Sequence, residues 1–135
     1  MLIYKTRWFD RWARKERLTA PGLCKAVEEL ANGLFDADLG SGLFKKRVGR
    51  SRQGKRGGFR VLVATNKSGS FIFIYGFSKN QRANIEIHEA DALKKLATHL
   101  LSMRAEAWRR AVDAGELIEV NCYGEEELSD TVGCS

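Results

Sequence analysis

Hydrophobic and polar positions change their spacing several times along the chain, and each change marks the boundary of a predicted element. Residues 2–5 alternate as a short strand does, whereas apolar positions in residues 9–17 and 19–33 recur at helical spacing. The second of these helices has threonine at its expected N-cap, proline in its first turn and glycine at its end. Trp8 and Trp12 lie four residues apart, and we expect both in the core.

The middle of the chain predicts strands separated by glycine-containing loops. The run FIFIYGF has hardly any polar alternation, which is typical of a strand buried on both faces at the centre of a sheet. The NKSG turn before it lies between two apolar runs and predicts a hairpin. We expect loops at 36–42 and 49–57, strands at 43–48, 58–65 and 70–77, and the hairpin turn at 66–69.

The C-terminal part predicts a polar loop at 78–84 and one long helix at 88–112. The order β-α-α-β-β-β-α corresponds to a single α+β domain, residues 1–112, with an N-terminal helical hairpin and the long C-terminal helix packed on a mostly antiparallel sheet. Residues 113–135 are expected to be an acidic, flexible tail. Within it the run LIEV either pairs as a strand or docks elsewhere, and disorder is expected from Glu125 onward.

The length and composition indicate one soluble domain. A chain of 135 residues is long enough for a single hydrophobic core. It has no apolar run near the roughly 18 residues that span a membrane, and its first residues lack the apolar core of a signal peptide. We therefore expect a cytoplasmic protein without a membrane partner. Cys24, Cys122 and Cys134 form no CxxC pair, and we expect free thiols in a reducing compartment.

The net charge of +6 is unevenly distributed along the chain. From Asp113 onward there are seven acidic residues and no Lys or Arg, so the first 112 residues carry all 23 bases against 17 − 7 = 10 acids, a net of +13. A domain this basic indicates a polyanionic partner, and a nucleic acid comes first. The alternative is that the charge only keeps the protein soluble, and the clustering of the bases argues against it.

The strongest cluster is the run LFKKRVGRSRQGKRGGFR at residues 43–60, which contains eight basic residues and no acidic one. Its glycines let backbone amides approach a phosphate closely, and its cations neutralise phosphate charge. A solvated, mobile loop is the alternative. Arg60 favours a binding site, because a charged residue on a central strand is costly unless it faces one. The eight bases are Lys45, Lys46, Arg47, Arg50, Arg52, Lys55, Arg56 and Arg60.

A second polar group follows the apolar strand and should meet the first. In a hairpin the start of one strand lies beside the end of its partner, so Arg60 is expected near Ser78 and Lys79. Such a site can cleave RNA, because the 2′-hydroxyl of RNA is the nucleophile and the protein needs only a base, an acid and cations. A merely exposed loop is the alternative. The group consists of Tyr75, Ser78, Lys79, Asn80, Gln81 and Arg82.

The two histidines differ in their expected roles. His88, at the start of the last predicted helix, can reach the site as an acid or base, with a capping or surface role as the alternative. His99 lies within the helix and is expected to be structural. Because the basic region has no acidic residue, the sequence argues against a two-metal nuclease, and we expect no metal or other cofactor.

The segments DADLGSGLFKKRVGRSRQGKRGGFRVLVA and FIFIYGFSKNQRANI closely resemble the RelE/HigB-like toxins of bacterial type II toxin–antitoxin systems. The resemblance covers about residues 1–112 and implies a compact fold of two helices, an antiparallel sheet and a further helix. It implies an endonuclease that cleaves mRNA on the 70S ribosome and inhibits translation. It also implies a cognate antitoxin protein, of helix-turn-helix character, that neutralises the toxin.

Position by position, the resemblance assigns roles to the strands and the loops. Arg60 matches the strand arginine that contacts the scissile phosphate, and Lys45 and Arg47 occupy the strand where catalytic lysines can lie. RelE has an arginine where Asn80 stands and a tyrosine near Glu86, so Lys79 or His88 becomes the candidate acid or base. The candidate catalytic residues are Lys45, Arg47, Arg60, Lys79, Asn80 and His88, and the candidate RNA-binding residues are Lys46, Arg50, Arg52, Lys55, Arg56 and Arg82.

Two other functions stay open. The related ParE branch shares the fold but inhibits DNA gyrase, and it is not expected to carry this dense basic run with the strand arginine. A non-catalytic RNA-binding module would keep the basic loop without needing the geometry of Arg60.

Overall fold

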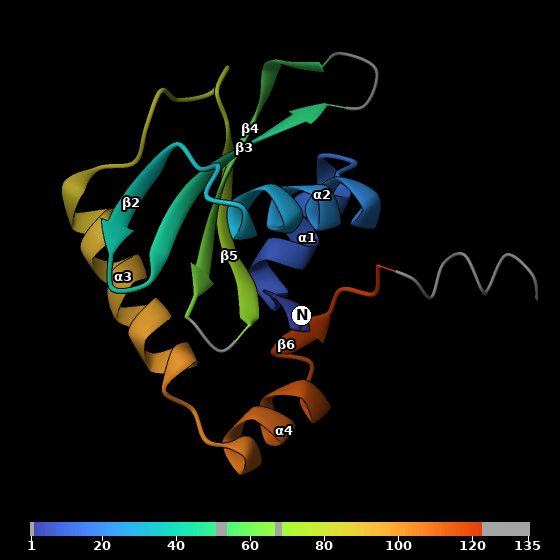
Figure 1. Cartoon of the computed structure of the whole chain (residues 1–135), viewed down its shortest axis with the longest axis vertical. Helices are drawn as coiled ribbons and strands as arrows, with labels where there is room; N and C mark the ends of the chain where they lie inside the picture. Colours follow the sequence, from blue (N-terminus) through green and yellow to red (C-terminus); the bar gives the residue numbers. More distant parts are fainter. Residues whose placement is uncertain (1, 51–53, 67–68, 123–135) are drawn as a thin grey trace, which may run out of the picture.

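A computed structural model describes residues 2–50, 54–66 and 69–122, apart from the side chains at 50 and 54–57. Within these ranges the chain forms six strands and four helices (Figure 1). In chain order they are β1 (Leu2–Thr6), α1 (Arg7–Lys15), α2 (Ala20–Ala31), β2 (Ala37–Gly40), β3 (Leu43–Arg50), β4 (Gly54–Thr65), β5 (Ser70–Ser78), α3 (Ile87–Leu101), α4 (Ala105–Asp113) and β6 (Leu117–Glu119).

The strands form one mostly antiparallel sheet in the order β2-β3-β4-β5-β1-β6. The first strand, β1, pairs parallel with β5, and the other neighbouring strands pair antiparallel. Seven of the nine residues of β5 are buried, because neighbours flank this strand and helices cover it. The predicted α+β fold and the predicted burial of FIFIYGF on both faces are therefore confirmed.

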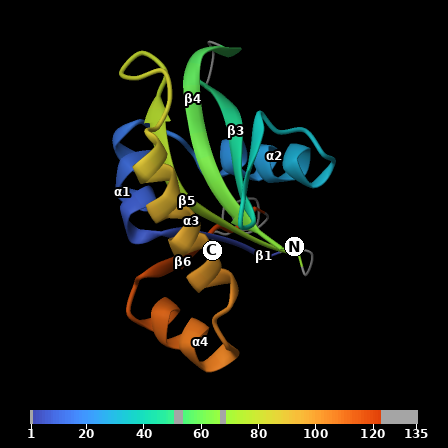
Figure 2. The same ribbon diagram turned by 90° about the vertical axis from the view of Figure 1, so that its left-hand side faces the viewer.

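Helices cover both faces of this sheet (Figure 1). On one face, Phe9 of α1 and Leu23 of α2 belong to the same buried cluster as Val61 of β4. On the other face, Leu100 of α3 packs in a cluster with Leu62 of β4, and α4 joins this cluster below α3. Seen from the α3 side, the far ends of β3 and β4 extend beyond the helix (Figure 2). That uncovered end is where polar strand residues can meet a ligand.

Three predicted element boundaries are wrong. The segment expected to be a loop at 36–42 contains β2, which pairs with the edge of β3. The loop expected at 49–57 is shorter, because β3 runs to Arg50 and β4 begins at Gly54. The single long helix is two helices, since α3 ends at Leu101 and α4 begins at Ala105. The break turns α4 so that Trp108 packs edge-on against Tyr4, with ring centroids 5.0 Å apart.

The ordered sheet continues into the segment expected to be a tail. The first three residues of the LIEV run form β6 (Leu117–Glu119), which pairs with β1, and both Leu117 and the following Val120 are buried. The fold therefore includes the first part of residues 113–135, as far as Cys122. Glu125 and the residues after it, for which disorder is expected, lie outside the ranges that the structure describes.

The two tryptophans of α1 have different environments. Trp12 packs against the core and lies directly over Gly76 of β5, where an added Cβ would come within 2.3 Å of the indole ring. Trp8 is 47% exposed and stacks on Tyr75 at a centroid distance of 4.7 Å. The prediction of a core position is confirmed for Trp12 and wrong for Trp8, which lies at the edge of the helix–sheet contact.

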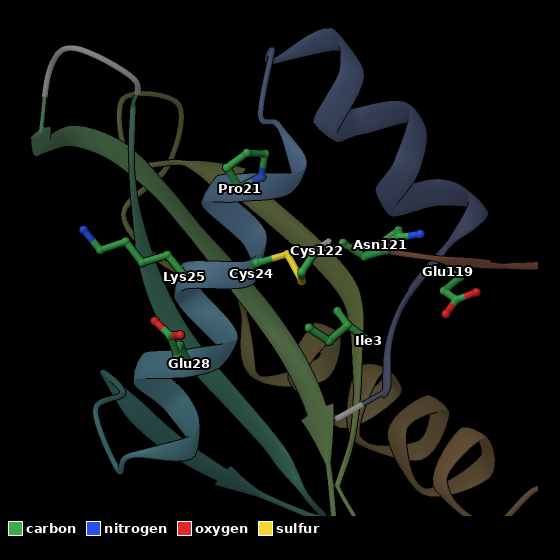
Figure 3. Close-up of a pocket in the computed structure, with 9 residues that line it drawn as sticks. Ile3, Pro21, Cys24, Lys25, Glu28, Glu119, Asn121 and Cys122 are labelled. Atoms are coloured by element: carbon green, nitrogen blue, oxygen red, sulfur yellow. A yellow bond between two sulfur atoms is a disulfide. The ribbon is translucent and has the colours of Figure 1, made fainter. Parts of the chain in front are cut away.

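Cys24 and Cys122 form a disulfide, so the prediction of free thiols is wrong for these two residues (Figure 3). The bond joins α2 to the segment that follows β6, across a sequence separation of 98 residues. Pairing of β6 with β1 brings Cys122 over α2, a proximity that sequence spacing does not reveal. The bond borders a surface cavity of about 540 Å³ that Lys25 and Glu28 also line. Cys134 lies outside the described ranges.

Candidate functional site

Three basic side chains of β3 and β4 project from one face of the sheet. Arg47 and Arg60 are direct partners in the antiparallel ladder, and Lys45 pairs with Leu62 two positions further along. Side chains alternate along a strand, and Val61 packs beneath α1 and α2. Lys45, Arg47 and Arg60 therefore share the opposite face, which α3 covers only in part (Figure 2).

Lys46 lies on the other face, away from these three residues. Its ammonium group is 2.7 Å from the Glu29 carboxylate of α2, and its side chain is only 5% exposed. Lysine is rarely buried unless it is paired. Its position thus fits a structural ion pair between β3 and α2 and does not place Lys46 on the basic surface.

Asp36 supplies a carboxylate to the basic surface formed by Lys45, Arg47 and Arg60, although the basic run 43–60 itself contains no acidic residue. Its Oδ2 atom lies 3.1 Å from Nε of Arg60 and 4.0 Å from Nε of Arg47. The Arg60 side chain is 10% exposed and the Arg47 side chain 46% exposed. The Asp36 amide donates a hydrogen bond to the Lys45 carbonyl at 2.8 Å, which ties Asp36 to β3. The alternation of DADL is the sequence signal for β2, whereas the contact of Asp36 with the arginines depends on the tertiary structure.

The loop after β5 meets these strand residues, as the hairpin argument predicts. Arg60 pairs with Phe77, and Phe59 pairs with Ser78, so the start of β4 lies beside the end of β5. Across the sheet, the Lys45 ammonium group contacts the side-chain oxygen of Asn84 at 3.4 Å. The predicted proximity of the start of β4 to Ser78 and Lys79 is therefore confirmed for the backbone.

Arg82 fixes the shape of this loop. Its guanidinium contacts both carboxylate oxygens of Glu89 in α3, at 2.5 and 3.2 Å. Its Nε donates to the carbonyl of Asn84 at 2.9 Å, and its guanidinium carbon lies 5.8 Å from the centroid of the Phe77 ring. These contacts make Arg82 an internal clamp between the loop and α3, whereas its place in a basic loop predicts a role in RNA binding.

The charge of Glu89 is stabilised by the same clamp. The hydrogen bond from Arg82, together with the backbone amide of Glu86, lowers the pKa of Glu89 to about 2. The carboxylate of Glu89 correspondingly raises the pKa of Arg82. Glu86 and Glu89 also form a capping box at the start of α3, so the clamp and the helix N-terminus stabilise each other.

Lys79 and Asn80 stand exposed at the tip of the turn that follows β5. The Asn80 amide donates to the hydroxyl of Ser78 at 3.2 Å, and the Lys79 amide donates to the carbonyl of Gly58 at 3.4 Å. The backbone of the turn is thus attached to β4, while both side chains face solvent.

The two histidines lie in different places on α3. The His88 side chain is 80% exposed, and its Nε2 atom is 3.1 Å from the Glu86 carboxylate. It borders a polar cavity of about 480 Å³ that Arg82, Asn84, Glu86 and Glu89 also line. His99 lines a different, mainly apolar cavity of about 600 Å³ with Trp8, Tyr75 and Leu96 among its neighbours. Only His88 therefore lies near the loop that meets the basic strands.

The structure does not describe the side chains of four predicted RNA-binding residues. Arg50 ends β3, and Lys55 and Arg56 belong to β4, but their side chains lie outside what the structure describes. Arg52 falls entirely outside the described ranges.

Across the described ranges, no group of three or more histidine, cysteine, aspartate or glutamate side chains is arranged to hold a metal ion. Nor is any helix there long and apolar enough to cross a membrane.

The arrangement can bind a phosphodiester. Arg47, Arg60 and Lys45 present three cations on one face of the sheet, and Asp36 lies within 4.0 Å of both guanidiniums. Arginine can engage phosphate oxygens in parallel hydrogen bonds, and lysine adds a point charge. His88 lies in the first turn of α3, beside Glu86, and Lys79 lies exposed on the turn after β5.

Comparison with known proteins identifies the family of the chain. Among the curated proteins, nothing matches the chain significantly. A family model described as the RelE toxin of the RelE/RelB toxin–antitoxin system matches residues 1–120. The match covers every strand and helix, including β6. The family implies that the protein has a cognate antitoxin as its partner. The chain therefore belongs to the RelE toxin family of toxin–antitoxin systems.

Proposed function

We propose that this toxin is a metal-independent endoribonuclease that cleaves mRNA on the 70S ribosome and so inhibits translation. The observation that supports the proposal best is the pairing of Arg60 with Arg47 on one face of the sheet, with Lys45 two positions along. Asp36 compensates the nearly buried Arg60 at 3.1 Å, whereas Arg47 is 46% exposed and 4.0 Å from the same carboxylate oxygen. A phosphate of RNA is the anion that the exposed Arg47 guanidinium would bind.

The chemistry requires no external nucleophile. The 2′-hydroxyl of RNA loses its proton and attacks the adjacent phosphorus, the P–O5′ bond breaks, and the 5′-oxygen takes up a proton. The products are a 2′,3′-cyclic phosphate and a free 5′-hydroxyl. Arg60, Arg47 and Lys45 stabilise the additional negative charge of the transition state. His88 and Lys79, on the clamped loop side, are the candidates for proton transfer, with Asn80 positioning the RNA.

The remaining parts of the proposal follow from the chemistry of the partner. The toxin acts in the cytoplasm, where translating ribosomes present single-stranded mRNA. Arg50, Arg52, Lys55 and Arg56, which are neighbours in the sequence, add positive charge that attracts the RNA backbone whatever the base sequence. The antitoxin neutralises the toxin and has helix-turn-helix character, which would let it bind DNA as well.

The test is cleavage of a translated mRNA in a reconstituted translation system, mapped by primer extension. Wild-type protein should give discrete cuts within codons, and Arg60→Ala should lower the rate by about 100-fold, as loss of a transition-state contact does. Arg60→Lys keeps the charge and distinguishes charge from guanidinium geometry. Arg109→Ala, which removes an exposed cation from α4, is the matched control and should cut normally.

The ends of the cut RNA test the metal-independent chemistry. Attack by the 2′-hydroxyl predicts 2′,3′-cyclic phosphate ends and no cutting of an mRNA with a 2′-deoxynucleotide at the cleavage position. Ends with a 3′-hydroxyl and a 5′-phosphate would contradict this mechanism. Inhibition of DNA gyrase without any mRNA cleavage would replace the proposal with the gyrase-inhibitor function, and RNA binding without cleavage would leave a non-catalytic module.

A further inference from the structure

The site contains a built-in anion whose role the RNA chemistry does not explain. One oxygen of Asp36 contacts both Arg60 and Arg47, at 3.1 and 4.0 Å. Two guanidiniums facing each other across adjacent strands repel one another, and an anion placed between them removes that repulsion. Asp36 thus occupies a place that a phosphate oxygen could also take.

The two contacts are unequal in distance and exposure. Arg60 is close to Asp36 and almost completely buried, whereas Arg47 is further from Asp36 and half exposed. Asp36 itself is held by its backbone hydrogen bond to Lys45 and by the pairing of β2 with β3. A phosphate arriving at this surface would therefore recruit the loosely held Arg47, while Arg60 keeps its position against Asp36.

We propose that Asp36 is a positioning residue of this site, the internal counter-ion that holds Arg60 in place and keeps Arg47 available for the phosphate. The proposal rests on the ribonuclease function above and extends it to regulation of affinity. A fixed negative charge opposes binding of any RNA backbone, so Asp36 lowers general RNA affinity while it raises turnover. Loss of Asp36 should accordingly affect binding and catalysis in opposite directions.

The binding half is tested with a short single-stranded RNA and full-length protein, by fluorescence anisotropy over a series of salt concentrations. Asp36→Asn should bind several-fold more tightly at low salt, and the slope of log Kd against log salt should steepen by about 0.7, the value for one more neutralised phosphate. The matched control is Asp38→Asn, which removes the same charge two residues away. Asp38 instead accepts a hydrogen bond from the Gly40 amide, and its variant should keep the wild-type slope.

The catalytic half is tested with ribosomes programmed with a short mRNA. Asp36→Asn should lower kcat by about 10- to 100-fold without raising KM, because a misplaced catalytic group costs rate rather than binding. Its pH–rate profile should keep the wild-type shape. Asp36→Glu keeps the charge but moves it, so its salt slope should stay at the wild-type value while kcat falls to an intermediate level; this variant also decides the matter if Asp36→Asn does not fold.

The following results of these binding and cleavage experiments would contradict the proposed role of Asp36 or of the ribonuclease. The inference is overturned if Asp36→Asn binds RNA no more tightly than Asp38→Asn, or cuts as fast as wild type. Loss of the acidic limb of the pH profile would assign proton abstraction to Asp36 and also overturn the positioning role. If the wild-type protein cuts no RNA at all, the proposed ribonuclease function fails, and the salt series still decides whether Asp36 is the counter-ion.

Discussion

Arg82 and Glu89 form a two-contact ion pair, with Nη2–Oε1 at 2.5 Å and Nη1–Oε2 at 3.2 Å. The pair joins the loop that follows β5 to the first turn of α3. Lys79 and Asn80 lie at one end of this loop, and Asn84, which contacts Lys45, lies at the other. The position of the candidate proton-transfer groups relative to the basic strands therefore depends on this ion pair.

The Arg82–Glu89 pair should make the stability of the protein depend on pH in the acidic range. The pKa of Glu89 is about 2, below its ordinary value of 4.5, so its contribution is fully present above about pH 4.5 and is lost as the pH falls through about 2. The thermal stability difference between wild type and Glu89→Gln should thus shrink steadily over this range. Glu106→Gln, in the first turn of α4, is the control and should not reproduce the trend. An NMR titration midpoint of the Glu89 carboxyl near 4.5 would contradict the prediction.

Gly76 should be intolerant of even one methyl group. An added Cβ would lie 2.3 to 2.8 Å from three ring atoms of Trp12, and Trp12 also packs edge-on against Phe59. Gly76→Ala should therefore destabilise the protein by about 1–3 kcal/mol, the usual cost of overpacking. Gly22→Ala is the matched control: its Cβ would lie 3.8 Å from the nearest atom, and alanine in helix α2 should gain about 0.5–1 kcal/mol. Urea unfolding measures the stability of both variants. A Gly76→Ala midpoint equal to that of wild type would contradict the close packing of Trp12 on Gly76.

Lys46 should contribute to stability and not to RNA binding. Its ion pair with Glu29 is on the face away from Lys45, and its side chain is almost completely buried. Lys46→Met keeps the aliphatic stem and removes the charge, and it should cost about 1–3 kcal/mol in urea unfolding. Its salt slope of RNA binding should equal that of wild type, whereas Lys45→Met should flatten the slope. A flattened slope in Lys46→Met would return Lys46 to the RNA-binding surface.

The Cys24–Cys122 bond should stabilise the folded chain through its long loop. A cross-link that closes 98 residues restricts the unfolded chain strongly, and removing it should cost about 2–4 kcal/mol. Urea unfolding of the oxidised protein, the reduced protein and Cys24→Ser measures this cost. Because the chain has three cysteines, thiol titration of the denatured protein should give one thiol before reduction and three after. Three thiols before reduction would show that the bond is not formed.

Much of the fold was predictable because it depends on local pattern. The uninterrupted apolar run of β5 and the helical spacing of α1 and α2 each predict their own element. Local pattern failed where tertiary packing decided the boundary. Three residues after Leu101 interrupt the long helical pattern, and the resulting turn allows Trp108 to reach Tyr4.

The site was predictable in part, for the same reason. Antiparallel pairing follows from the hairpin, so the proximity of Arg60 to the end of β5 could be predicted from strand order. Whether a charged side chain faces a ligand, another element or solvent depends on neighbours that are distant in sequence. Lys46 meets Glu29 on α2, and Arg82 meets Glu89 on α3, and neither partner has a sequence signal of its own.

By itself the sequence determined the α+β class, the two basic groups and the adjacency of the start of β4 to the end of β5, because periodicity and hairpin geometry act over short distances. Only the tertiary structure decided which of these cations share a face, that Asp36 lies between Arg47 and Arg60, and that Cys24 reaches Cys122. Those contacts join strands and helices that are far apart along the chain. They exist because the burial of the two faces of the sheet brings their partners together in the folded chain.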